Sequence, residues 1–512
     1  MRNDVMSSEG GSASGGKKTV VLAILDGWGI GRDDESNAIY RAQPETVRWI
    51  ETHFPAGALK AGGISSGLPW NEEGNSEVGH MTLGAGRVLY QHFLKINKAI
   101  ETGEFFKNEA LLGAFTHAKE KKTAVHLVGL LTDAIVHAAM PHLEALLKMA
   151  HDTHIPEIYL HLFTDGRDSP PKSAGTLLKK VEELTARYGG TLASLGGRFY
   201  GMDRDKHTER TEAAYRALVG KAEAMSAEEA LKRAYEKGLS DEYVFPVSMG
   251  NGIKDGDAVI FFNFREDRMR QIAEPFVTAG KVYAVTMTNY YEGRLKERAA
   301  FTATIISETL GEMLAKNGKV QLRVAETEKY AHVTYFFNGL QEKPFRGEYR
   351  VMIPSASVRS HAELPEMQAK TITDRVMVAL GEGLYDFILC NYANPDMVAH
   401  TGDVAATVKA VQTVDAELSR LIRAVMDGGH TLIVTSDHGN AEVIFDLQTG
   451  QPDTRHNSND VPLYVIGKEF EGRKLAEDPR EVVGMLSDVA PTILTLMGIP
   501  VPKAMTGTPL LT

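Results

Sequence analysis

The sequence predicts an α/β protein with mainly parallel sheets, and two observations carry that prediction. Short apolar, β-branched runs alternate with longer amphipathic segments along nearly all 512 residues. Parallel sheets require this order, because each pair of parallel strands is joined by a long crossover, usually a helix. Hydrophobic residues make up 43% of the chain and charged residues 24%. These values are typical of soluble globular proteins, and the length allows two or three domains.

The expected strands are short and end at turn or polar residues. They include residues 19–25, 123–131, 157–163, 191–195, 258–262, 282–287, 386–390, 431–435 and 462–467. Amphipathic segments between them predict helices, such as 402–427, which ends at Gly428 and Gly429 as a glycine-capped helix would. Residues 1–18 lack apolar content and predict a flexible tail.

Composition and motif failures exclude several functions. The net charge of −11 disfavours a nucleic acid or an anionic membrane as partner, and no run approaches the ~18 residues of a membrane span. The single cysteine, Cys390, lies in an apolar run that predicts a buried, inert thiol; no internal disulfide can form, which suits the cytoplasm. Two glycine-rich phosphate motifs fail, because Lys18 and Arg32 occupy positions that a P-loop and a dinucleotide loop need for other residues.

The residues that follow the strands separate into two chemistries, and in open α/β sheets ligands collect at the carboxyl ends of strands. Acids and histidines follow the strands near both ends of the chain: Asp26, Asp396, His400, Asp437 and His438. Arginines follow those in the middle: Arg167, Arg198, Arg204, Arg265 and Arg268. We therefore expect one domain, 19–90 with 305–512, interrupted by a second, 91–304, with crossings near 88–92 and 303–310.

The acid and histidine set predicts a metal centre. Asp396 and His400 are four residues apart after Pro395, which can open a helix, so their side chains would share one helix face. Asp26, Asp437, His438 and His456 add oxygen and nitrogen ligands without a thiolate. Such a set suits manganese, and also zinc or magnesium-like ions, with ligands enough for two. Each residue alone fits a turn, a cap or a packed histidine equally well.

Ser76, in "GNSEVGH", has two interpretations at this point. It fits the N-cap of a following helix, although Gly79 stands where a capping box needs Glu or Gln. It also fits a nucleophile, because a hydroxyl bound to a metal loses its proton more easily. The pattern alone leaves both open.

The arginines, together with His137 after strand 123–131, predict a cationic pocket for a small substrate with a phosphate and a carboxylate. Each arginine alone would fit a surface ion pair. Asp168, beside Arg167, fits either a loop cap or a general base. Lys329 fits either a charge placed against a transferring phosphoryl group or a solvated lysine.

Long motifs across residues 19–512 resemble a known family. They are "LDGWG", "GNSEVGH", "FTDGRDSPP", "MDRD", "FFNFREDR", "AETEKYAHVTYFFNG", "NYANPDMVAH", "TSDHGNAE" and "DVAPTILTLMGIPVP". The family is the cofactor-independent, or 2,3-bisphosphoglycerate-independent, phosphoglycerate mutases, a branch of the alkaline phosphatase superfamily. The resemblance implies an alkaline-phosphatase-like metal domain interrupted by a substrate domain.

The resemblance also implies a reaction and its residues. The reaction is interconversion of 3-phosphoglycerate and 2-phosphoglycerate, in glycolysis and gluconeogenesis, through a phosphoserine on Ser76. Two divalent ions, commonly manganese, are implied, one on Asp396, His400 and His456, the other on Asp26, Ser76, Asp437 and His438. The implied substrate residues are His137, Arg167, Asp168 as acid/base, Arg198, Arg204, Arg265, Arg268 and Lys329. We expect a cytoplasmic monomer whose two sheets face each other across a hinge near the crossings.

One loop departs from the family pattern. Where relatives usually read Ser-Asp-Gly-Gly-Val-His-Ser-His, this chain reads "TDAIVHAA", so Ala134 and Ile135 replace glycines and Ala138 and Ala139 replace polar residues. The change predicts altered substrate affinity or rate. Two rivals remain: another phosphomutase or phosphatase of the superfamily that uses Ser76, and a phosphoglycerate sensor without catalysis.

Overall fold

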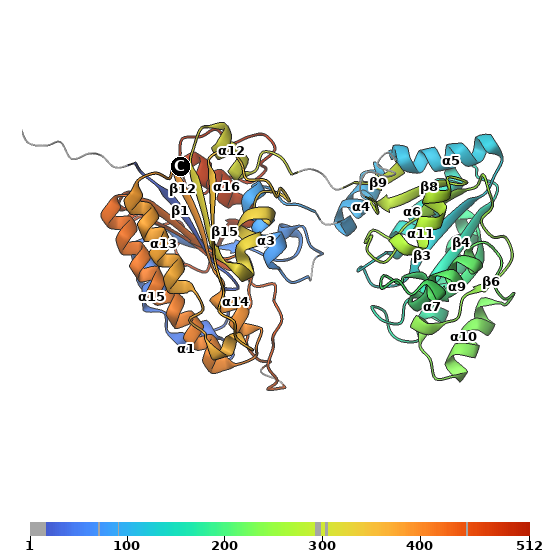
Figure 1. Cartoon of the computed structure of the whole chain (residues 1–512), viewed down its shortest axis with the longest axis horizontal. Coiled ribbons are helices and arrows are strands. Elements are labelled where there is room, and N and C mark those ends of the chain that lie inside the picture. The colour runs from blue at the N-terminus through green and yellow to red at the C-terminus, as the bar shows by residue number, and fades with distance from the viewer. Residues whose placement is uncertain are drawn as a thin grey trace, which may run out of the picture. The chain divides into compact units, whose positions relative to one another are not determined.

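The structure is a computed structural model that describes residues 17–69, 72–90, 92–291, 298–302, 306–446 and 449–511. The tail expected over residues 1–18 therefore falls almost wholly outside the described residues. The chain forms two compact units, one from residues up to 90 with residues from 305 onward, the other from residues 91–304. In Figure 1 the first unit carries the blue and the orange-to-red ends of the chain. No helix among the described residues is long and apolar enough to cross a membrane.

The first unit is built on an eight-stranded sheet in the order β11-β10-β12-β1-β13-β14-β2-β15. Its strands are β1 (Val20–Leu25), β2 (Ala56–Lys60), β10 (Gln321–Glu326), β11 (Glu348–Ile353), β12 (Phe387–Tyr392), β13 (Thr431–Thr435), β14 (Val461–Ile466) and β15 (Val482–Met485). Neighbours are parallel except where β14 meets β13 and β2. The wholly buried β1 lies between β12 and β13, with Leu22 opposite Leu389 and Ile433.

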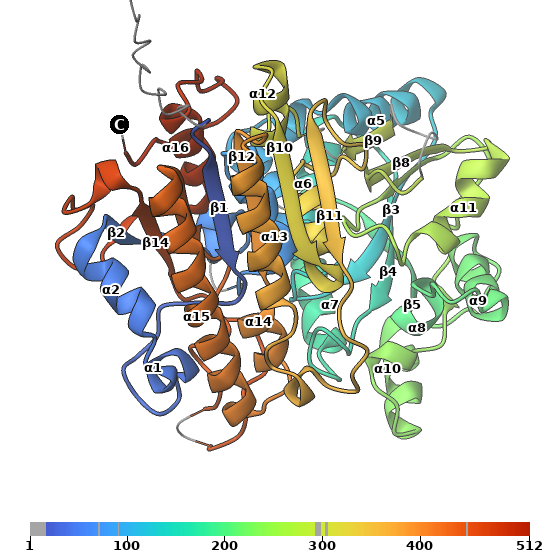
Figure 2. The same cartoon turned by 60° about the vertical axis from the view of Figure 1, so that its left-hand side comes forward.

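Helices cover both faces of this sheet. α13 (Ala369–Glu382) and α15 (Val404–Gly428) pack on one face, in front of β1, β12 and β10 in Figure 2. α3 (Ser76–Ala85), α12 (Leu310–Lys316) and α16 (Val489–Leu496) lie on the other (Figure 1). The remaining helices of the unit are α1 (Ala38–Ala42), α2 (Glu45–His53) and α14 (Asn394–Ala399). α15 ends at Gly429, whose φ of 68° is left-handed, so the expected glycine cap is confirmed.

The second unit has a seven-stranded sheet in the order β6-β5-β4-β3-β7-β8-β9, parallel except between β5 and β6. Its strands are β3 (Val125–Leu131), β4 (Ile158–Thr164), β5 (Thr191–Gly197), β6 (Val247–Ser248), β7 (Ala258–Phe261), β8 (Tyr283–Thr288) and β9 (Ala299–Phe301). Its helices are α4 (His92–Glu101), α5 (Glu109–Lys121), α6 (Met140–Asp152), α7 (Ala174–Tyr188), α8 (Arg198–Gly201), α9 (Thr208–Leu218), α10 (Ala227–Glu236) and α11 (Arg270–Ala279). Each unit has a hydrophobic core of its own.

The predicted α/β class with mainly parallel sheets is confirmed. Every strand expected from the sequence is present, with ends shifted by at most two residues. Strands β2, β6, β9, β10, β11 and β15 were not anticipated. Cys390 is buried in β12, and burial raises the pKa of its thiol to about 12, so it is inert as predicted.

Candidate active site

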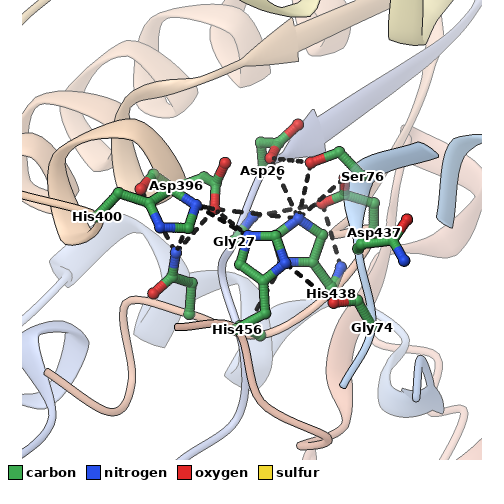
Figure 3. A network of polar contacts seen from close by, with 12 residues as sticks. Asp26, Gly27, Gly74, Ser76, Asp396, His400, Asp437, His438 and His456 are labelled. Atoms are coloured by element: carbon green, nitrogen blue, oxygen red, sulfur yellow. Dashed lines mark hydrogen bonds and ion pairs between the residues drawn. The ribbon is translucent and has the colours of Figure 1, made fainter. Parts of the chain in front are cut away.

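Three strands of the first unit deliver their following residues to one place. Asp26 comes directly after β1, Asp396 lies in α14 after β12, and Asp437 follows β13. Because β1 lies between the other two strands, the three carboxylates converge (Figure 3). All three are buried, with 0%, 2% and 0% of their surface exposed. Such burial of negative charge requires nearby cations.

Ser76 is the first residue of α3 and is not its cap. Asn75 is the N-cap, because its side-chain oxygen accepts from the backbone N–H of Val78 at 2.9 Å. The cap interpretation of Ser76 is therefore wrong. Its hydroxyl instead lies 2.9 Å from Nε2 of His438 and 3.3 Å from Oδ1 of Asp26. Gly79 permits this approach, since a Cβ there would lie 2.5 Å from the carbonyl oxygen of Asp437.

Lys329 supplies the only ammonium among the described residues that touches this cluster. Its Nζ lies 2.6 Å from Oδ1 of Asp26, 2.7 Å from Oδ2 of Asp396 and 2.7 Å from Oγ of Ser76. Although burial disfavours its charge, Asp26 and Asp396 raise the pKa of Lys329 above its ordinary value. Three carboxylates against one ammonium leave two negative charges uncompensated. Burial and the neighbouring Asp437 accordingly raise the pKa of Asp26. The donor set fits divalent cations.

A histidine pair beside Asp396 gives a second indication of metal binding. His400 and His456 bring their Nε2 atoms within 2.9 Å of each other, and these atoms lie 3.2 and 3.1 Å from Oδ1 of Asp396. Each Nδ1 faces a backbone carbonyl, that of Thr454 or Gly74, at 2.7 and 3.0 Å. Each Nδ1 therefore carries the hydrogen, and both Nε2 lone pairs point at one carboxylate. Two lone pairs and an anion meet favourably only around a proton or a metal ion.

His80 and Asn391 belong to this centre, although the sequence did not single them out. Nδ1 of His80 donates to the carbonyl of Ser76 at 2.8 Å and lies 3.1 Å from Oδ2 of Asp437. Its Nε2 accepts from Asn391, which also donates to Oδ2 of Asp26 at 2.7 Å. With Nδ1 committed as a donor, His80 orients ligands and is not itself one. The one available signal was its place four residues after Ser76, on the same helix face.

The strand ends of the second unit carry the arginine set. Arg198 begins α8 after β5 and is buried; its Nη1 donates to Asp165 at 2.6 Å and to Asp168 at 2.5 Å. Arg204 pairs with Asp267 at 2.8 Å, and Arg265 with the same carboxylate at 3.4 Å.

The other two arginines are less tightly held. Arg167 is half exposed, 3.8 Å from Glu242, and Arg268 reaches the carbonyl of Met202 at 3.5 Å. Burial, then Arg204 and Arg198, lower the pKa of Arg268, as expected among crowded cations. The crowding fits an anionic ligand.

His137 lies beside these groups in neutral form. Its Nε2 is 3.8 Å from Oδ2 of Asp168, and its Nδ1 is buried without a hydrogen-bond partner among the described residues. Burial and then Arg198 lower its pKa to about 4. A neutral imidazole with one unsatisfied nitrogen, in a cationic surrounding, fits a contact to a ligand hydroxyl or phosphate oxygen.

The loop that departs from the family pattern keeps an ordinary backbone. Ala134 and Ile135 are not among the non-glycine residues with positive φ, so glycine is not required at either position. Ala138 and Ala139 are buried in the core of the unit. Ala139 is the N-cap of α6 and makes no side-chain capping bond. The substitutions therefore remove polar groups without forcing the backbone into strain.

Comparisons with known proteins agree with the acid and histidine set and with the arginine set. The model of the Metalloenzyme superfamily matches residues 18–501. The 2,3-bisphosphoglycerate-independent phosphoglycerate mutase of Clostridioides difficile (strain 630) is 44% identical over 509 residues, covering 96% of this chain and 98% of that protein. That of Ectopseudomonas mendocina (strain ymp) is 45% identical over 505 residues, with 96% and 98% covered.

A solved structure extends the comparison to the fold. The phosphoglycerate mutase of Leishmania mexicana, determined at low cobalt concentration, matches with a TM-score of 0.59 and 30% identity over 96% of this chain and 97% of that one. As the motifs predicted, the chain belongs to the 2,3-bisphosphoglycerate-independent phosphoglycerate mutases, within the metalloenzyme superfamily.

Proposed function

We propose that the chain interconverts 3-phosphoglycerate and 2-phosphoglycerate through a phosphoserine on Ser76, in glycolysis and gluconeogenesis and without 2,3-bisphosphoglycerate. The observation that carries the proposal is the position of the Ser76 hydroxyl, 2.9 Å from Nε2 of His438 and 2.7 Å from Nζ of Lys329, among uncompensated carboxylates. A serine hydroxyl placed against an ammonium group and an imidazole in such a centre suits phosphoryl transfer. Family membership supports this function over that of a phosphatase or a sensor.

Ser76 Oγ attacks the substrate phosphorus, and the bond from phosphorus to the glycerate oxygen breaks. Lys329, adjacent to Oγ, neutralises part of the charge that gathers on the phosphoryl oxygens. Asn391 and His80 hold Asp26 and Asp437 in orientation during the step.

Divalent ions, when bound, would lower the pKa of the Ser76 hydroxyl and draw charge from the phosphoryl oxygens. The residues that would hold one ion are Asp396, His400 and His456, whose ligand atoms lie close to one another. For the other ion we assign Asp26, Ser76, Asp437 and His438, because the Ser76 hydroxyl lies beside Asp26 and His438. We assign manganese, because the donors combine hard carboxylate oxygens with borderline imidazole nitrogens.

The second unit supplies the groups that bind glycerate and move its protons. We assign substrate binding to His137, Arg167, Asp168, Arg198, Arg204, Arg265 and Arg268, with Lys329 facing the phosphoryl group. Asp168, ionised beside Arg198, takes a proton from the free hydroxyl of the glycerate and gives it to the oxygen that has left phosphorus. The deprotonated oxygen then attacks the phosphoserine, and the Ser76 oxygen begins and ends the cycle without its proton. This exchange returns every group to its starting state.

Further aspects of the proposal follow from the reaction. Water has to be excluded while the phosphoserine exists, because hydrolysis would turn the enzyme into a phosphatase. We also propose that the protein acts as a cytoplasmic monomer.

An enolase-coupled assay of the purified, manganese-loaded protein with 3-phosphoglycerate tests this function, because enolase consumes only the 2-isomer. We expect 2-phosphoglycerate without free phosphate. Ser76→Ala should abolish turnover, while Ser66→Ala, which removes another buried hydroxyl, should leave most of it. Release of phosphate without 2-phosphoglycerate, or full activity of Ser76→Ala, would overturn the proposal.

A further inference from the structure

Asp165 is a buried carboxylate at the centre of the arginine set. It follows β4 by one residue, and 1% of its surface is exposed. Oδ1 accepts from Nη1 of Arg198 at 2.6 Å and from the backbone N–H groups of Arg167 and Asp168 at 3.2 and 3.0 Å. Oδ2 accepts from the Thr132 hydroxyl at 2.6 Å and from the Ser169 N–H at 3.1 Å. Both oxygens are thus saturated by donors.

The charge of Asp165 is maintained in spite of its burial. Burial disfavours the ionised form, yet the hydrogen bonds from Thr132, Arg198 and the backbone lower the pKa of Asp165. A carboxylate that is ionised, buried and bonded by five donors is rigid, because no movement of it leaves every donor satisfied.

These bonds join the loops that follow three neighbouring strands. Thr132 follows β3, residues 167–169 follow β4, and Arg198 follows β5. Ser169 strengthens the link to the first loop, because its hydroxyl lies 2.8 Å from that of Thr132 and 2.5 Å from Oδ1 of Asp133. That first loop leads to His137. One carboxylate therefore ties together the segments that carry His137, Arg167, Asp168 and Arg198.

The backbone around Asp165 leaves little freedom for another arrangement. Gly166 has a φ of 65°, and a Cβ at this position would lie 2.7 Å from the backbone nitrogen of Glu242. The packing of Gly166 against Glu242 and the hydrogen bonds of Asp165 together fix the turn that follows Asp165. This combination is typical of residues that support a binding site.

We propose that Asp165 is a positioning residue that sets the direction of the Arg198 guanidinium and the place of Asp168. Asp165 and Asp168 both accept a hydrogen bond from Nη1 of Arg198. This turns the other guanidinium nitrogens, which make no hydrogen bond among the described residues, toward an anionic group. The ligand class is a phosphate or a carboxylate of a small acid. The inference rests on the proposed function, because it takes that acid to be phosphoglycerate.

Asp165→Asn tests the inference, because asparagine keeps the shape and removes the charge. The amide of asparagine would place its own N–H groups against donors from which the carboxylate oxygens accept hydrogen bonds. We expect KM for 3-phosphoglycerate to rise by about 10- to 100-fold and kcat to fall, since a displaced binding group costs about this much. Manganese affinity and stoichiometry, which report on the first unit, should stay unchanged. A KM and kcat within twofold of the unchanged protein would overturn the role.

Asp257→Asn is the matched control. Asp257 is also a buried carboxylate of the second unit, but it lies before β7, bonded to His126 at 3.1 Å and to the N–H of Lys254 at 2.7 Å. Its loss should lower the melting temperature and leave KM within about twofold, since it touches no arginine of the set. Equal rises in KM for both variants would show general destabilisation and overturn the inference.

A double variant tests the role of Asp165 if Asp165→Asn does not fold. Thr132→Val removes the hydroxyl that donates to Oδ2 of Asp165, and Ser169→Ala removes the hydroxyl that links Thr132 to Asp133. The double variant leaves the contact between Asp165 and Arg198 in place. A smaller rise in KM, about three- to tenfold, is expected, and an unchanged KM contradicts the role. The proposed function is judged separately, on the unchanged protein: if that protein forms no 2-phosphoglycerate, the function fails, whatever the variants do.

Discussion

Nζ of Lys329 lies 2.7 Å from Oγ of Ser76 and bridges Asp26 and Asp396 within the same centre. The lysine reaches this place from a short turn, Thr327–Lys329, directly after β10. It is the group that keeps the carboxylates compatible with burial when no other cation neutralises them.

Lys329→Met should therefore act on both stability and rate. We expect kcat to fall by about 100- to 1000-fold, because a charge next to the transferring group is lost. In chelator the variant should be less stable by about 3–5 kcal/mol, the usual cost of breaking a buried ion pair. Manganese should narrow that gap. Calorimetry with chelator and with metal measures it; Lys316→Met, on the exposed side of α12, is the control. Equal stability in chelator would contradict the compensating role.

His400 and His456 should make metal binding weaken in acid. The hydrogen bond with Asp396 raises the pKa of His400, and the same carboxylate, against the effect of burial, raises that of His456. Both imidazoles thus begin to take up protons above pH 6.5 in the metal-free protein, and protons compete with the ion. Calorimetric titration with manganese should show affinity falling from pH 8 to pH 6. His456→Asn should flatten this dependence, and identical affinity at both pH values would rule out the assigned ligands.

The metal-free form has the opposite pH trend at these two residues. The pKa of each histidine is raised in the folded state, so the pair stabilises the metal-free protein. This stabilisation is fully present below the pKa of the unfolded chain, near 6.5, and is lost as the pH rises through the pKa values of the folded protein. Acid therefore stabilises the fold of the metal-free protein through these two histidines, although it weakens metal binding.

Ala139→Ser should stabilise the second unit. Ala139 is the N-cap of α6 with extended backbone, φ −146° and ψ 141°, and makes no capping bond. Pro141 has no N–H, so a serine hydroxyl at position 139 would accept from the N–H of His142, which already donates to the carbonyl of residue 139 at 3.0 Å. Because that bond would be shared, the gain should be at most about 1 kcal/mol. A rise in melting temperature checks this. Ala138→Ser, one residue earlier and fully buried, should give no gain, and a lower melting temperature for Ala139→Ser would show that the site lacks room for a hydroxyl.

His142→Leu should reduce the acid sensitivity of the second unit. Burial lowers the pKa of His142 to about 3, and its Nε2 meets Asn97 at 2.9 Å. The unfolded chain takes up a proton below pH 6.5 that the folded chain refuses, so stability falls between about pH 6.5 and 3, by up to about 1.4 kcal/mol per pH unit. Melting temperatures in chelator from pH 7.5 to 4.5 should fall less for the variant. The exposed His207→Leu is the control; parallel curves for both would exclude His142 as a cause.

The sequence predicted the strands whose apolar runs are continuous and missed those whose runs are interrupted. β10 holds Gln321 and Arg323 inside a buried strand, where Arg323 stacks over Phe337 and Phe387. Local polarity argued against a strand, and aromatic neighbours from elsewhere in the chain reversed that preference. β2, with the sequence AGALK, has little strand propensity and is held by pairing with β14 and β15.

The candidate site was predictable where a strand end identifies a residue. Asp26, Asp396 and Asp437 meet because their strands are neighbours, and the position of each residue after a predicted strand indicated it. Asp165 and His80 were missed because their importance depends on partners that only the fold brings near. The assigned roles of all these residues stay predictions until the variants are made.

The placement of β1 bears on how the chain reaches its folded state during synthesis. The hydroxyl of Thr19, just before β1, donates to the carbonyl of Tyr385, 366 residues further along the chain. At about 5–20 residues per second the ribosome takes roughly 20–70 s to make that partner. Meanwhile the apolar strand VVLAIL has no sheet to join, whereas the second unit is complete and can fold. Until β12 and β13 emerge, the exposed apolar strand of the first unit can avoid aggregation only if chaperones cover it or if aggregation is slower than synthesis.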